Sequence, residues 1–404
     1  MIQQQTSWLQ ITILWMAGIA AAMQFAKFSV AFDALTTFYG ANPALIGLAL
    51  SIVGLVGLVF GVSAGVLSGH MGYGRVLVAG LIIGAVSSVL QAFLPPLPIM
   101  IASRIIEGMS HLGIVVTAPT MMASVSSDGH RSIVMGLWGT FFGVAFALMA
   151  WLGSPIIAQY GIEGLFLAHG LLMAGLAAGV LAVFKRPDTS NDGNHAALPK
   201  LQLSTFVREN LKVYANVRTS MPGLIFLFHT SMFMALLTFL PRLSGEPGIT
   251  AFLLVILPLV GITGAFSAGA IAQYLLSPVS LAILAYGGVG VAVVIVNWAI
   301  SAGAGFVSAS MVLIFVAGIV PGAVFAMIPF LSRHPSEQAL ANGAVVQLGN
   351  IGSTTGPPVF AAIISASGSF GLMVAIIALS ICGIGVALLA AAYTRSAASR
   401  TLKL

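Results

Sequence analysis

The sequence predicts an all-α integral membrane protein with twelve transmembrane helices in two pseudo-symmetric six-helix bundles. Three observations support this class: charged residues make up only 6% of the 404 residues, hydrophobic residues make up 59%, and long apolar runs recur along the whole chain. Soluble domains contain roughly a quarter charged residues, so water is not the main solvent of this chain. The apolar runs are continuous rather than alternating, which excludes a membrane β-barrel.

A bilayer core about 30 Å thick needs roughly 20 apolar helical residues for each crossing. Turn-forming residues separate the runs, for example Asn42 before Pro43, Pro95 after the third run and Asp128 after the fourth. The first six predicted spans are 10–37, 44–67, 75–94, 98–123, 132–157 and 163–184. The second six are 219–241, 249–275, 279–300, 306–331, 338–366 and 371–394.

Basic residues set the expected orientation, because short cytoplasmic loops are enriched in Lys and Arg. With both termini in the cytoplasm, only Arg242 falls on the outer side. The basic residues expected on the inner side include Arg75, Arg131, Lys185, Arg186, Lys200, Arg208, Lys212, Arg218, Arg333, Arg395, Arg400 and Lys403. We therefore expect a bacterial inner-membrane protein whose pI near 9.7 reflects topology and contact with anionic lipid, with no nucleic-acid partner.

One long polar gap, 185–218, divides the chain into an N-terminal bundle at 1–184 and a C-terminal bundle with a short cytoplasmic tail at 219–404. Residues 204–217 of this cytoplasmic linker are expected to form an amphipathic surface helix. The halves share sequence: segments 55–65 and 259–269 are identical at six of eleven positions. Parallel repeats of this kind are a transporter architecture.

The loop after the second span resembles a motif of the major facilitator superfamily, Gly-x-x-x-Asp-x-x-Gly-x-Arg/Lys. Gly65, Gly72 and Arg75 match it, whereas Gly69 stands where the family has the acid. In the family this acid helps to latch the two halves together on the cytoplasmic side, so the resemblance does not carry the latch over. It implies the twelve-helix fold for essentially the whole chain.

The fourth span adds a second resemblance, because Arg104 to Gly108 reads Arg-Ile-Ile-Glu-Gly where the family often has Arg-x-x-Gln-Gly. The family's antiporter signature, a glycine-rich run that ends in Gly-Pro, is absent from residues 136–143. This lowers the expectation of a typical drug/proton antiporter. Within the superfamily the chain looks most like the cyanate-permease-like bacterial branch.

Arg104, Glu107 and His111 follow i, i+3 and i+7 spacing, so they lie on one helical face. Ionised side chains are costly in hydrocarbon and usually face a cavity or a partner. We expect Glu107 to carry protons, because opposite charge favours its ionised form and desolvation disfavours it. Arg104 would tune this equilibrium or bind substrate with His111. The alternative is a structural Arg104–Glu107 ion pair.

Gln24 and Lys27 share a face of the first span, with Lys27 near its middle. Lys27 is expected to contact a substrate anion or to balance Glu107, with Gln24 beside it as a substrate contact. Asp33 lies nearer the outer end and is a proton-coupling candidate, although a solvated or helix-terminal role fits equally well.

The second half offers His229 near mid-depth of the seventh span, either as a substrate contact or as a hydrogen-bonded packing residue. In the eleventh span Gln347, Asn350 and Thr354 share a face by their i, i+3, i+7 spacing. They are candidates for substrate binding or for hydrogen bonds to neighbouring helices.

No catalytic or metal-binding motif is present: the chain lacks a Walker loop, a serine elbow, an HExxH pair and a Cys/His metal set. We therefore expect no enzyme activity, no cofactor and no metal. The sequence favours a monomeric, proton-coupled secondary transporter, a symporter that moves a small organic solute by alternating access. Two deep basic side chains, Lys27 and Arg104, stand against one deep acid, Glu107, and this excess of positive charge favours an anionic or zwitterionic solute. The alternatives are a drug or metabolite efflux pump and a non-transporting membrane receptor or scaffold.

Overall fold

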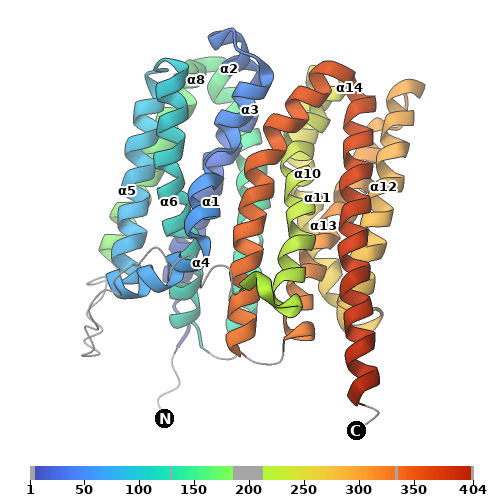
Figure 1. The fold of residues 1–404 in the computed structure, drawn as a ribbon. Helices are drawn as coiled ribbons and strands as arrows, with labels where there is room; N and C mark the ends of the chain where they lie inside the picture. The colour runs from blue at the N-terminus through green and yellow to red at the C-terminus, as the bar shows by residue number, and fades with distance from the viewer. Residues whose placement is uncertain (1–4, 128–129, 185–212, 333–334, 402–404) are drawn as a thin grey trace. The chain divides into compact units, whose positions relative to one another are not determined.

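The computed structural model describes residues 5–127, 130–184, 213–332 and 335–401, and in these ranges every regular element is helical (Figure 1). The all-α class predicted from the sequence is confirmed. The helices of the first half are α1 (Trp8–Val30), α2 (Phe32–Tyr39), α3 (Pro43–Ser51), α4 (Gly54–Met71), α5 (Tyr73–Ala92), α6 (Leu97–Ser124), α7 (Arg131–Gly139) and α8 (Phe141–Val183). The second half has α10 (Val217–Phe239), the 3₁₀-helix η1 (Leu240–Ser244), α11 (Pro247–Tyr274), α12 (Pro278–Ala302), α13 (Phe306–Leu331) and α14 (Pro335–Thr401).

Nine helices in the described part of the chain are long and apolar enough to cross a membrane, or ten if the bent pair α3 and α4 forms one span. Two of the nine are very long, α8 with 43 residues and α14 with 67. Each contains a glycine with non-helical backbone, Gly161 at φ 71° and Gly368 at φ 56°. Figure 1 shows α14 as an orange and a red arm that run in opposite directions. The number twelve stays a prediction, since it requires both α8 and α14 to cross twice.

Several helix ends follow directly from the sequence. Proline opens α3, α11 and α12, where the missing N–H costs nothing. Ser277 caps α12 by accepting a hydrogen bond from the Ser280 amide, and Asn216 caps α10 by accepting one from the Arg218 amide. The predicted surface helix at 204–217 lies largely outside the described residues.

Three breaks interrupt the predicted spans. The chain turns at Ala31 between α1 and α2, and Thr140 separates α7 from α8. Between Ser51 and Gly54 the axes of α3 and α4 bend by 47°. The first, second and fifth predicted spans are therefore each built from more than one helical segment.

The helices form two compact units. The first contains residues 1–42 and 52–203, and the second contains residues 43–51 and 204–404. The helix α3 groups with the second unit although it belongs to the first half of the sequence. The predicted division at 185–218 stays a prediction.

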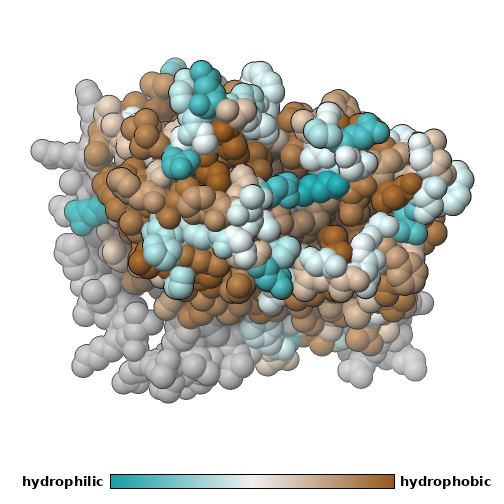
Figure 2. Space-filling view, turned by 90° about the horizontal axis from the view of Figure 1, so that it is seen from above, coloured by the Kyte–Doolittle hydropathy of each residue, from teal (hydrophilic) through white to brown (hydrophobic). Residues whose placement is uncertain are grey.

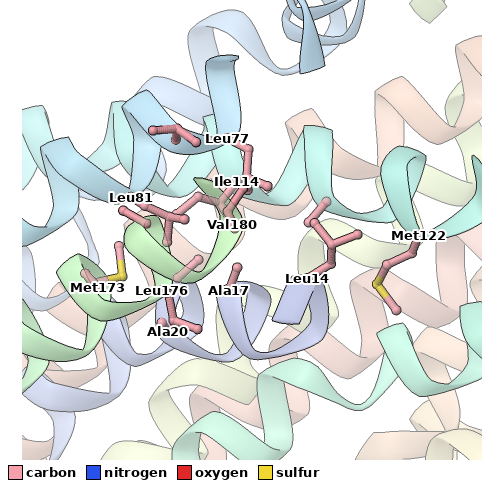
Figure 3. Packing of buried hydrophobic residues seen from close by; sticks show 14 of the residues in the cluster. Leu14, Ala17, Ala20, Leu77, Leu81, Ile114, Met122, Met173, Leu176 and Val180 are labelled. Atoms are coloured by element: carbon pink, nitrogen blue, oxygen red, sulfur yellow. The ribbon is translucent and has the colours of Figure 1, made fainter. Parts of the chain in front are cut away.

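A dense hydrophobic core holds the first unit together. Figure 3 shows Leu14, Ala17 and Ala20 of α1 packed among side chains of three other helices. Those partners are Leu77 and Leu81 of α5, Ile114 and Met122 of α6, and Met173, Leu176 and Val180 of α8. Small alanines on α1 allow the larger side chains of α5, α6 and α8 to approach its backbone closely. This packing fixes the four helices that carry the site.

In the second unit α14 packs along α10 and also holds α3. Glycine allows α14 to approach α10 closely, because a Cβ atom on Gly349 would lie 2.7 Å from the Phe226 ring. On α3, a Cβ atom on Gly47 would lie 3.0 Å from the backbone of Pro357 and Pro358. The Ser51 hydroxyl donates to the Thr354 carbonyl oxygen at 2.7 Å. Small residues and one hydrogen bond therefore attach α3 to α14.

Viewed onto the helix ends, the surface is mostly hydrophobic with hydrophilic patches (Figure 2). Large apolar side chains point outward along several helices, including Phe93, Trp151, Leu171, Phe266, Trp298 and Phe370. Such exposed apolar surface is costly in water and normal in lipid. The protein is therefore an integral membrane protein.

Candidate functional site

Four helices of the first unit bring polar side chains together inside an otherwise apolar bundle. We call seven of them the polar cluster, and each is at most 2% exposed. They are Lys27 of α1, Ser88 and Gln91 of α5, Ser103, Arg104 and Glu107 of α6, and His169 of α8. Hydrogen bonds connect all seven.

The Glu107 carboxylate is the centre of the polar cluster. Its Oε1 atom lies 2.6 Å from Lys27 Nζ and 3.3 Å from Ser88 Oγ. Its Oε2 atom accepts from Gln91 Nε2 at 2.9 Å and from an Arg104 guanidinium nitrogen. A carboxylate offers about four acceptor positions, so the donors from α1, α5 and α6 fill this one. Burial of the charge is compensated by two ion pairs and two neutral donors.

Two stacked phenyl rings support the cationic side chains. The Phe28 and Phe166 rings are 5.2 Å apart at an interplanar angle of 18°. The Arg104 guanidinium lies 4.1 Å from the Phe28 ring centre, and Lys27 Nζ lies 5.3 Å from that of Phe166. Both contacts fall within cation–π range, so the rings hold the two cations against Glu107.

Helix geometry also favours the position of Lys27. It lies in the last turn of α1, where the helix dipole favours a cation. The predicted span 10–37 put Lys27 near mid-helix, whereas α1 ends at Val30. The Lys27 side chain is nonetheless completely buried.

Ser88 connects the ion pair to His169. Its hydroxyl lies 2.8 Å from Lys27 Nζ and 2.8 Å from His169 Nδ1. The other ring nitrogen, Nε2, lies 2.9 Å from the Ala20 carbonyl oxygen. A serine hydroxyl carries one hydrogen, so Ser88 donates either to His169 or to Glu107 at any one time.

Gln24 and His111 lie beside the polar cluster. The Gln24 amide donates to Ser110 Oγ at 2.8 Å, and His111 Nδ1 lies 3.1 Å from the Ala21 carbonyl oxygen. Within the described part of the chain, the Oε1 atoms of Gln24 and Gln91 are buried without a hydrogen-bond partner. These two buried acceptors are thus available to a donor group.

This arrangement can respond chemically to one proton. Protonation of Glu107 would remove the negative charge that Lys27 and Arg104 contact and would turn an acceptor into a donor. One of its four donors would then have to move away. Because those donors come from α1, α5 and α6, a change of protonation acts on the packing of three helices.

Other candidates of the first unit lie apart from the polar cluster. Asp33 is exposed in the first turn of α2, a position that suits an acid at a helix N-terminus. In the loop motif, Gly65 lies within α4, and Gly72 joins α4 to α5 with φ 93° and ψ 121°. This backbone conformation explains the glycine. Arg75 is exposed in the first turn of α5.

In the second unit the His229 ring stacks between two phenyl rings, 5.7 Å from Phe226 and 4.8 Å from Phe233. The side chain is 3% exposed, and its Nδ1 atom has no hydrogen-bond partner among the described residues. A buried ring nitrogen without a hydrogen-bond partner is costly, which favours a role for His229 beyond packing.

The eleventh-span candidates have different partners. Gln347 Oε1 accepts from the Tyr214 hydroxyl at 2.6 Å, and burial raises the pKa of Tyr214. Asn350 donates to the Val346 carbonyl within the same helix. Thr354 accepts from Ser51 through its backbone, while its hydroxyl is buried and lacks a partner in the described ranges.

Sequence reasoning missed four of the seven members of the polar cluster, Ser88, Gln91, Ser103 and His169. Ser88 and Gln91 were not selected, although their i, i+3 spacing in an apolar run was an available signal. His169, near one end of its predicted span 163–184, was not selected either. In the described ranges no group of three His, Cys, Asp or Glu residues could hold a metal ion.

Two comparisons with known proteins bear on this site. The sequence profile of the Major Facilitator Superfamily matches residues 14–357, which include every member of the polar cluster. The chain is also 29% identical over 181 residues to the inner membrane transport protein YajR of Escherichia coli (strain K12). That alignment covers 44% of this chain and 39% of YajR, so it spans well under half of each protein.

Proposed function

The chain belongs to the Major Facilitator Superfamily, and from this premise we propose that it is a proton-coupled secondary transporter of a small organic solute. The proposal includes alternating access, in which the solute site opens to each side of the membrane in turn. YajR is named as an inner membrane transport protein, which supports a bacterial inner membrane as the location. Cytoplasmic termini, contact with membrane lipid and a monomeric state belong to the same proposal.

One observation carries the proposal: the Glu107 carboxylate is completely buried and holds donors from three helices. Ionisable groups inside a membrane protein are costly and generally mark pathways for ions, protons or substrates. Glu107 is the one member of the polar cluster whose protonation would weaken both ion pairs at once. We assign it the role of proton carrier.

The same geometry supports the solute class. When Glu107 takes up a proton, Lys27 and Arg104 both lose the negative charge that they contact. A carboxylate or another anionic group on the solute would replace that charge. Proton and anion would thus bind together, as expected for a symporter of anionic or zwitterionic solutes. The buried amide oxygens of Gln24 and Gln91 would accept hydrogen bonds from a solute hydroxyl or ammonium group.

A drug or metabolite efflux pump is the second candidate. It is favoured by the aromatic surroundings of His229, where two phenyl rings flank an imidazole whose Nδ1 atom has no hydrogen-bond partner in the described chain. Flat aromatic or amphipathic solutes stack on such rings. A receptor or scaffold without transport activity would show no solute flux at all.

The test is uptake by the full chain in proteoliposomes, with and without an imposed pH gradient. The solute panel consists of labelled organic acids, sugars and amphipathic cations. Glu107→Gln should abolish gradient-driven accumulation and retain downhill exchange of the same solute. The matched control is Glu163→Gln, which makes the same change at an exposed position.

Accumulation by Glu107→Gln at the wild-type level would show that the Arg104–Glu107 pair is structural. Accumulation of amphipathic cations alone, against the direction expected for symport, would favour the efflux pump. Absence of flux for every solute on the panel would favour the receptor or scaffold.

A further inference from the structure

His169 is a buried titratable group, and the proposed role of Glu107 as proton carrier does not involve it directly. It lies on α8, while Glu107 lies on α6, and Ser88 of α5 stands between them. The two contacts are 2.8 Å from His169 Nδ1 to Ser88 Oγ and 3.3 Å from Ser88 Oγ to Glu107 Oε1. A single hydroxyl therefore separates an imidazole from the carboxylate.

The Ala20 carbonyl fixes the tautomer of the imidazole. A carbonyl oxygen only accepts hydrogen bonds, so His169 Nε2 must carry a hydrogen to make its 2.9 Å contact with Ala20. In the neutral ring Nδ1 is then bare and accepts from the Ser88 hydroxyl. In the protonated ring Nδ1 carries a hydrogen and donates to Ser88 instead.

The Ser88 hydroxyl can satisfy both states without moving its oxygen. With His169 protonated, Ser88 accepts from His169 and from Lys27 Nζ, and donates to Glu107 Oε1. With His169 neutral and Glu107 protonated, the carboxylic acid donates to Ser88, and Ser88 donates to His169. Both arrangements use one donor and two acceptor positions, which is the full capacity of a serine hydroxyl.

We propose that Ser88 relays a proton between His169 and Glu107, so that His169 is a second proton-holding residue of the transport cycle. In the transfer, the N–H bond at His169 Nδ1 breaks as that proton bonds to Ser88 Oγ. The former Ser88 hydroxyl proton bonds to Glu107 Oε1. An imidazolium and a carboxylate become a neutral imidazole and a carboxylic acid, so charge and atoms balance. This proposal rests on the proposed role of Glu107 as proton carrier.

Other charged and titratable groups face His169 from two of the helices packed against it. Lys27 of α1 and Glu107 of α6 both contact Ser88, the hydroxyl that His169 contacts, and Arg104 of α6 pairs with Glu107. The members that α5 contributes to the polar cluster, Ser88 and Gln91, are neutral. His169 Nδ1 and Lys27 Nζ both contact Ser88 Oγ, so an imidazolium at His169 would stand close to the Lys27 ammonium. Transfer of the proton to Glu107 relieves the repulsion between imidazolium and Lys27.

The experiment follows protonation directly and needs no transported solute. The full chain in detergent is acidified rapidly, and infrared spectroscopy records the carboxylic acid band that disappears in Glu107→Gln. Ser88→Ala and His169→Gln should slow the appearance of this band about a hundredfold, the lower end of what a positioned proton-transfer group contributes. Ser88→Thr retains the hydroxyl and should react at the wild-type rate.

A merely structural role for Ser88 predicts a different pattern. An unchanged rate in Ser88→Ala, or equal slowing in Ser88→Ala and Ser88→Thr, overturns the relay. Nitrogen-15 NMR of labelled histidine provides a second measurement, which does not depend on the reaction rate of any variant. The resonances lost in His169→Gln should report the Nε2–H tautomer in the neutral state, and an Nδ1–H tautomer overturns the proposal.

The result also separates this relay from the proposed function. If Glu107→Gln loses coupling and Ser88→Ala protonates at the wild-type rate, Glu107 is the proton carrier and the relay is wrong. If no carboxylic acid band depends on Glu107 at any pH, the proposed proton carrier itself is wrong, and the relay with it.

Discussion

Lys27 Nζ lies 2.6 Å from Glu107 Oε1, although the two residues are 80 positions apart in the sequence. This contact joins α1 to α6, and both side chains are completely buried. The free energy of this ion pair decides whether the polar cluster is stable only when Glu107 is ionised.

Lys27→Met leaves the buried carboxylate without one of its two cationic partners. Removing one partner of a buried ion pair typically costs about 3–5 kcal/mol, so we expect the free energy of unfolding to fall by this amount. In a double-mutant cycle with Glu107→Gln, the double variant should lose less than the sum of the single losses, with a coupling of about 0.5–3 kcal/mol. Denaturant unfolding in detergent measures all four proteins, and additive losses would contradict the coupling.

Gly108 adjoins the break between α3 and α4. A Cβ atom there would lie 2.9 Å from the Val56 side chain and 3.3 Å from the carbonyl carbon of Val53. Gly108→Ala should therefore destabilise the protein by about 1–3 kcal/mol through overpacking. The control is Gly175→Ala on α8, where a Cβ atom meets nothing within 4 Å and alanine should stabilise the helix by about 0.5–1 kcal/mol. Equal melting temperatures for the two variants would show that α6 does not pack on Val53 as described.

Position 72 needs a glycine because of its backbone conformation and not because neighbouring atoms leave no room for a side chain. Its φ of 93° lies in a region that residues with a side chain rarely adopt, so Gly72→Ala should cost about 1–3 kcal/mol. Gly179→Ala on α8 provides a control with open space and no positive φ. Thermal unfolding of both variants in detergent checks this expectation. A Gly72→Ala protein as stable as wild type would place the junction of α4 and α5 in another conformation.

The surroundings of Tyr39, the last residue of α2, predict that the stability of the protein depends on pH. Burial raises its pKa from 10 to about 12, and its hydroxyl donates to the Pro95 carbonyl at 2.7 Å. A raised pKa means that the contribution to stability is complete below about pH 10 and is lost as the pH rises toward 12. Tyr39→Phe should lower the free energy of unfolding by about 1 kcal/mol near neutral pH, and this difference should shrink in the alkaline range.

Unfolding at several pH values, with Tyr274→Phe as the control, tests this expectation. Tyr274 is exposed, so its variant should match wild type at every pH. A difference between wild type and Tyr39→Phe that stays constant up to pH 12 would rule out the phenol as its source.

Much of the fold is predictable because lipid imposes a local rule on every crossing segment. Each helix must satisfy its own backbone hydrogen bonds and present apolar side chains, and both properties are visible within roughly 20 residues. The break after Ser51 escaped prediction because no proline or charge lies nearby to mark it. The break after Val30 has no proline, and the nearby Lys27 and Asp33 do not by themselves interrupt a helix. The break after Ser51 depends on the packing of α3 against α14, which is a long-range property.

The candidate site was predictable to the extent that its geometry is local. Arg104 and Glu107 are three positions apart on one helix, so their ion pair follows from helical spacing. Ser88 and His169 meet Glu107 only through the packing of α5 and α8, and serine is too common in such helices to stand out. Among the residues expected in the first half, the structure places Asp33 and Arg75 on the surface.

The assignment of Pro43–Ser51 to the second unit has a consequence for expressing this protein in pieces. A cut in the central linker gives two fragments, and the N-terminal one retains the nine residues that cover Pro357 and Pro358. A C-terminal fragment produced alone should therefore aggregate, and co-production of the N-terminal fragment should rescue its solubilisation. The two halves of this chain are not interchangeable modules, because one of them completes the folding of the other.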